Sequence, residues 1–148
     1  MKRYRSTSIT LFGLMVLPHA LACVGSGTPV AMSNIPVYPG ATRIDPAGDP
    51  VASVLLESME QAAAEEPNVE AEFTFYALPT GTTLESVRDF YVGEMEGTDW
   101  KPADDLTIDD DVFQMFGWER SKQAFGVGYV PEKISDVPLM LIMLATEK

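Results

Sequence analysis

Residues 72–97, with the sequence EFTFYALPTGTTLESVRDFYVGEMEG, decide the fold, because they join a strand pattern to a helix pattern through one turn. Residues 72–78 alternate, with Phe73 and Phe75 on one side, which is the period of a β-strand. Pro79-Thr80-Gly81 combines turn-forming residues and is expected to reverse the chain. The sequence therefore predicts a strand that leads through a turn into a helix.

The helix pattern begins at Thr82. Glu85 follows three residues later, which matches a capping box, in which each of two side chains accepts a bond from a backbone N–H of the first turn. Gly97 supplies the left-handed residue that ends many helices. The apolar residues between these ends form one stripe, which we expect to pack on a sheet: Leu84, Val87, Phe90, Tyr91 and Met95.

The chain after this helix predicts further strands. Residues 100–102 begin a short strand, and residues 112–120 and 123–130 are spaced as a hairpin. Residues 139–145 are apolar throughout and too few to span a membrane, so we expect a strand buried on both faces at the centre of the sheet. Three glycines in the hairpin indicate bulges or close approach to the backbone: Gly117, Gly126 and Gly128.

The chain before residue 72 predicts another helix. Asp49 followed by Pro50 is typical of a helix start, and the helix is expected over residues 50–66, with a strand over residues 51–57 as the alternative. Its apolar residues recur at helical spacing: Val51, Val54, Leu55, Met59 and Ala62. Together these elements predict an α+β fold, with a mostly antiparallel sheet of four to five strands and one or two helices packed on one face. We expect a single domain over residues 35–148.

The N-terminus has the three zones of an export signal. Lys2, Arg3 and Arg5 precede an apolar run at residues 11–17, and the small residues of Ala20-Leu21-Ala22 stand before Cys23. We expect residues 1–22 to be a signal peptide that is cleaved between Ala22 and Cys23. Cys23 is then the lipidation site of a lipoprotein, and residues 23–34, rich in Gly, Ser and Thr, are a flexible linker. The alternative is ordinary cleavage, which leaves a soluble secreted or periplasmic protein.

The acidic composition limits the partners of the chain. Loss of residues 1–22 removes three of the ten basic residues and none of the 22 acidic ones, and so takes the formal net charge from −12 to −15. Nucleic acid is not an expected partner, because its phosphates are bound by Lys and Arg. Anionic lipid headgroups are also repelled, so membrane attachment is expected through acyl chains on Cys23.

The same cleavage removes His19, the only histidine. If Cys23 is acylated, neither an imidazole nor a free thiol remains, which excludes Ser-His-Asp and Cys-His catalysis and histidine or thiolate metal sites. We therefore expect no enzyme activity and no cofactor. The acidic run of Asp109, Asp110 and Asp111 supplies oxygen ligands that calcium favours, but it lacks the glycine and terminal glutamate of an EF-hand loop. We interpret it as a solvated turn, with a cation site as the alternative.

Four aromatic residues of the hairpin are candidates for an interaction surface: Phe113, Phe116, Trp118 and Tyr129. Residues 112, 116 and 118 alternate with residues 113 and 115, so both faces of the strand carry apolar side chains. Such a strand is either covered on both sides or leaves an exposed patch. The sequence allows both core packing and a binding surface here.

Three short motifs resemble a known group. Ile35-Pro36-Val37-Tyr38-Pro39-Gly40-Ala41, Phe90-Tyr91 and Asp99-Trp100 follow the order "YPGA", "FY" and "GW" of small bacterial lipoproteins of uncharacterised function, with Asp99 in place of the usual glycine. The resemblance implies a cell-envelope location and an α+β fold, and it identifies no catalytic residues. We expect a non-enzymatic envelope lipoprotein that binds a partner protein or ligand at the membrane surface. The alternative is a carboxylate-based calcium-binding or enzymatic domain in the envelope.

Overall fold

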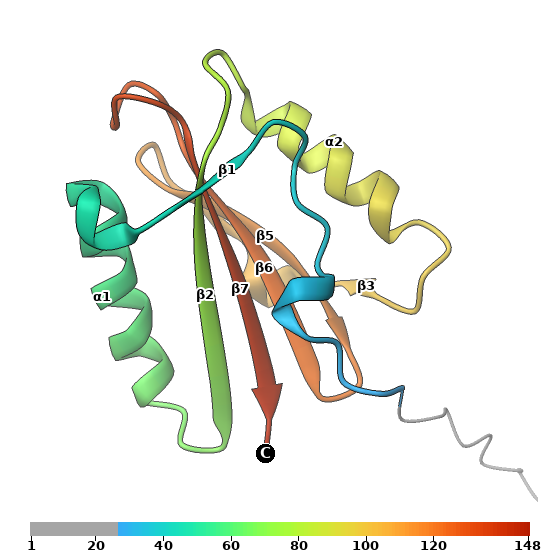
Figure 1. Cartoon of the computed structure of the whole chain (residues 1–148). Helices are drawn as coiled ribbons and strands as arrows, with labels where there is room; N and C mark the ends of the chain where they lie inside the picture. The colour runs from blue at the N-terminus through green and yellow to red at the C-terminus, as the bar shows by residue number, and fades with distance from the viewer. Residues whose placement is uncertain (1–26) are drawn as a thin grey trace, which may run out of the picture.

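The computed structural model describes residues 27–148, whose seven strands form one antiparallel sheet (Figure 1). The strand order is β1-β2-β7-β6-β5-β3, and β4 also pairs with β5. The strands are β1 (Thr42–Ile44), β2 (Val69–Ala77), β3 (Lys101–Pro102), β4 (Ile108–Asp109), β5 (Gln114–Arg120), β6 (Gln123–Val130) and β7 (Leu139–Glu147). The predicted α+β class with an antiparallel sheet is confirmed, and the short strands β1, β3 and β4 bring the number of strands to seven.

Strand β7 lies between β2 and β6 and is buried on both faces, as its continuous apolar run predicts. Met140 and Ile142 face the side of the sheet that carries helix α2 (Leu84–Met95). Leu139 and Leu141 face the side that carries helix α1 (Pro50–Ala64). Each helix therefore covers its own face of the sheet, rather than both helices lying on one face as the sequence predicts.

The chain crosses from one face to the other at the edge strand β1. Tyr38 and Ala41, before β1, pack with the α2 side, and Ile44, at the end of β1, packs with the α1 side. Figure 1 shows β1 passing across the edge of the sheet between the two helices. This crossing separates α1 from α2, and the periodicity of each helix alone could not reveal it.

Helix α1 begins as predicted. The Asp49 carboxylate accepts hydrogen bonds from the backbone N–H groups of Val51 and Ala52, both at 2.9 Å, which caps the first turn. The alternative strand over residues 51–57 is therefore wrong. Ala52 is fully buried against the sheet, whereas Val54 is 64% exposed, because two residues correspond to about 200° of rotation around a helix.

Helix α2 begins one residue later than predicted. Thr83 is the N-cap residue, and the capping box joins Thr83 to Ser86 through two side chain to backbone bonds of 3.2 Å. The predicted pair of Thr82 and Glu85 does not form, because the Thr82 hydroxyl donates to Pro79 O within the preceding turn. Gly97 has a φ of 76°, which confirms the left-handed residue after the helix.

The N-terminal segment is docked on the sheet from residue 28 onward. The Gln123 side chain accepts a bond from Val30 N at 2.7 Å and donates to Val30 O at 2.9 Å, and a short 3₁₀ turn follows at Met32–Asn34. Tyr91 donates its hydroxyl proton to Pro36 O at 2.8 Å. The predicted linker over residues 23–34 is therefore too long, because Gln123 satisfies backbone groups that a free linker would leave to water.

Candidate binding sites

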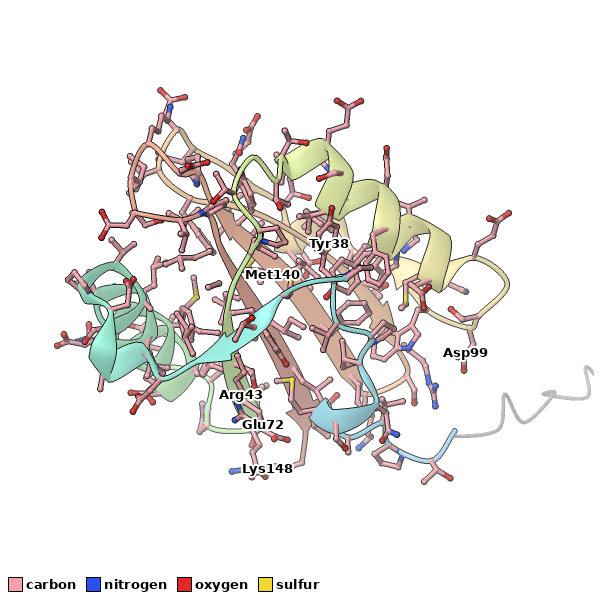
Figure 2. The ribbon with its side chains drawn as sticks, turned by 45° about the horizontal axis from the view of Figure 1, so that its top comes forward. Tyr38, Arg43, Glu72, Asp99, Met140 and Lys148 are labelled. Atoms are coloured by element: carbon pink, nitrogen blue, oxygen red, sulfur yellow. The ribbon has the colours of Figure 1, made fainter. Side chains whose placement is uncertain are left out.

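The predicted cleavage and lipidation residues, Ala22 and Cys23, lie outside the described residues, and their roles stay predictions. The described chain begins at Gly27, beside the end of the β5–β6 hairpin. Arg120 donates to Thr28 O at 3.1 Å and forms an ion pair with Asp99 at 3.2 Å. Figure 2 shows Asp99 on the same side of the domain as the point where the N-terminal segment leaves it. The path toward Cys23 therefore starts from a fixed position.

The four hairpin aromatics lie in the core. Phe113, Phe116, Trp118 and Tyr129 are each 8% exposed or less. Helix α2 covers Phe116, Trp118 and Tyr129, and Trp118 stacks on Phe125 with ring centroids 5.0 Å apart. Phe113 lies on the opposite face, over Gly128. These residues are buried, as the core interpretation predicts, and they form no exposed aromatic surface, although Phe113, Phe116 and Trp118 each line a hollow of the surface.

The acidic connection between β3 and β5 forms local bonds. Asp110 accepts a bond from Val112 N at 2.8 Å, and Asp109 accepts one from the Gln114 side chain at 3.0 Å. Within residues 27–148, no three Asp, Glu, His or Cys side chains are grouped to hold a metal ion. The structure thus does not bring Asp109, Asp110 and Asp111 together as ligands.

The hydroxyls of two buried tyrosines, Tyr91 and Tyr129, bond to the backbone of distant segments. Burial raises the pKa of Tyr91 far above its usual range, with a further increase from Tyr76, so its hydroxyl stays protonated and donates to Pro36 O. Burial, followed by the nearby Glu132, also raises the pKa of Tyr129, whose hydroxyl donates to Thr82 O at 2.8 Å. Both groups therefore act as hydrogen-bond donors that join distant segments.

One hollow lies at the start of α1, and we name it the α1 groove. Its volume is about 320 Å³. It is bounded by α1, by the chain just before β5, by the end of β6 and by the β6–β7 loop. Its lining residues are Pro50, Val51, Val54, Leu55, Val112, Phe113, Val130 and Ile134. The sequence does not predict this groove, because Val54 fits the helical stripe and Val112 fits the strand pattern. Only Ile134, an apolar residue among charged ones, indicates an exposed apolar site.

A second hollow of about 350 Å³ lies between α2 and β5, and we name it the α2 cleft. The Arg88 guanidinium lies 5.2 Å from the centre of the Phe116 ring, and the edges of Phe116 and Trp118 form part of the wall. Glu96 and Asp104 line the same cleft. Its charges are therefore mixed, and it does not select one sign of ligand.

The comparisons with known proteins found no matching family model, no similar curated protein and no similar solved structure. None of the helices within residues 27–148 has both the length and the apolarity to cross a bilayer.

Proposed function

We propose that the chain is an exported, non-enzymatic lipoprotein, anchored by acyl chains on Cys23, whose domain binds a partner in the cell envelope. The observation that carries the proposal is the position of the only cysteine, directly after Ala20-Leu21-Ala22 and an apolar run with a basic start. The acidic charge supports it, because a domain this negative gains little from anionic headgroups and needs another means of attachment.

The docked N-terminal segment supports a defined orientation. Thr28 lies five positions after Cys23, and a fully extended chain spans at most about 18 Å over five positions. Thr28 is bound by Arg120 and Val30 by Gln123, at the turn of the β5–β6 hairpin. With Cys23 in a bilayer, this end of the sheet faces the membrane and the β6–β7 loop faces away from it.

The α1 groove supports the binding role. It lies at the far end of the hairpin, where β6 ends and the β6–β7 loop begins. Strand β6 has eight residues, so the groove lies about 24 Å beyond the residue that holds the N-terminal segment. A groove in this position is open to proteins in the space beyond the membrane.

Mass spectrometry of the mature N-terminal peptide tests the anchor. We expect cleavage before Cys23 and a diacylglyceryl group on its sulfur. An unmodified Cys23 at the mature N-terminus would remove the anchor from the proposal. A mature protein that still contains residues 1–22 would also contradict the prediction that these residues are a cleaved signal peptide.

A further inference from the structure

We propose that the α1 groove binds an amphipathic helix of a partner protein, with the apolar face of that helix in the groove and basic residues along its edges. This inference rests on the proposed function, since it names the kind of partner that the domain binds.

The exposed apolar side chains of the groove carry the first step. Val54 is 64% exposed, Val112 48% and Ile134 37%, and these are three of the six large apolar residues that are exposed within residues 27–148. All eight lining residues are apolar. A small-molecule site usually holds a few placed polar groups, whereas recognition of a helix in a groove uses apolar anchors. The lining therefore fits a helix better than a small polar ligand.

The charges beside the groove carry the second step. Exposed Asp110 and Asp111 directly precede Val112, and the bond from Val112 N to Asp110 fixes one of these carboxylates next to the groove. Exposed Asp136 follows Ile134 by two residues and exposed Lys133 directly precedes it, so three carboxylates beside the groove outnumber one amine. This acidic rim attracts Lys and Arg and disfavours a second copy of the mature chain, whose formal charge is 7 − 22 = −15.

The place of the groove in the fold carries the third step. The groove and the bound N-terminal segment lie at opposite ends of the β5–β6 hairpin. With Cys23 in a bilayer, the groove therefore lies at the end of the hairpin that is farther from the membrane. A helix from another protein is the occupant that fits the apolar lining, the acidic rim and the place of the groove in the fold.

The test uses the mature protein in nanodiscs of zwitterionic phosphatidylcholine, with a tag after Lys148. That residue lies away from the groove, since its backbone N–H donates to Asn68 O before the start of β2. The probe is a fluorescent helix of about 18 Leu and Lys residues with one apolar face, which is roughly 27 Å long. A peptide of the same composition in scrambled order and empty nanodiscs serve as controls. We expect saturable binding by fluorescence anisotropy for the amphipathic helix alone.

Two valines on different helices provide matched variants. Val54→Lys places a charge in the groove and should weaken binding at least about tenfold, because an unpaired charge is costly to bury against the apolar face of the helix. Val92→Lys makes the same change on α2, at a residue that is 54% exposed, and should leave binding unchanged. Ile134→Lys, in the β6–β7 loop, repeats the test outside a helix. Raised ionic strength should weaken binding of the wild type, because salt screens the rim.

The inference is overturned if the wild type does not bind the helix, if the scrambled peptide binds equally, or if Val92→Lys weakens binding as much as Val54→Lys does. A wild-type dimer that Val54→Lys dissociates would assign the groove to a second copy instead. If Cys23 is acylated and the helix does not bind, this inference is wrong and the lipid anchor is unaffected. If the helix binds and Cys23 is unmodified, the lipid anchor is wrong and this inference is unaffected.

Discussion

Gln123 offers the sharpest test of how the N-terminal segment is held. Its side chain is 7% exposed and makes three hydrogen bonds, two to the backbone of Val30 and one to the Thr146 hydroxyl at 3.0 Å. Gln123→Leu keeps a similar size and removes all three bonds. Each is worth about 0.5–1.5 kcal/mol, and Val30 is partly exposed and regains water, so we expect a loss of about 2 kcal/mol.

Hydrogen exchange measures this loss where it occurs. A change of about 2 kcal/mol corresponds to a roughly 30-fold fall in protection of the Val30 amide. The amide of Ile142, in the central strand, exchanges through wider unfolding and should change much less. Gln114→Leu is the matched control, because that side chain bonds only to Asp109 and does not touch the segment. Equal protection of Val30 in Gln123→Leu and the wild type would refute the role of Gln123 in holding the N-terminal segment.

Three further changes test the core and the caps. Tyr91→Phe removes the bond to Pro36 O and should lower the free energy of unfolding in urea by about 1–2 kcal/mol. The wild type loses stability above about pH 10, because Tyr91 ionises in the unfolded chain while its raised pKa keeps it protonated in the folded state. Tyr91→Phe should show less of this loss. Gly128→Ala places a Cβ 2.5 Å from Phe113 and should cost about 1–3 kcal/mol in the same assay, so an unchanged midpoint would contradict the close packing. Asp49→Ala leaves two amides of α1 uncapped and should lower the free energy of unfolding by about 1 kcal/mol, which a fall in the melting temperature would report. Asp49→Asn should retain most of that stability.

The sequence predicts the elements of this fold well because each has a local cause. Asp49-Pro50 specifies the start of α1 through two backbone bonds, and the apolar run after Pro138 specifies a strand with no solvent face. The hairpin glycines were expected to mark close approach, and the Phe113 ring does lie against Gly128. Such features depend on neighbours in the chain, so they can be identified without the structure.

Features that depend on distant residues could not be predicted in this way. Gln123 and Val30 are 93 residues apart, and nothing near either residue shows that they bond. Val54 is exposed because Ala52, about 200° away around α1, is the residue that faces the sheet. Only the packing of α1 on the sheet distinguishes the two, and only the folded chain brings Val54, Val112 and Ile134 into one groove.

The most direct test of the central claim is the orientation of the domain on a membrane. If Cys23 is acylated, it provides no thiol, so Lys122→Cys at the hairpin turn or Asp136→Cys in the β6–β7 loop carries the only dye. With a quencher on the lipid headgroups of reconstituted vesicles, we expect strong quenching of the dye at position 122 and little at position 136. Equal quenching at both positions, or a protein that washes off the vesicles, would contradict an anchored domain whose groove faces away from the membrane.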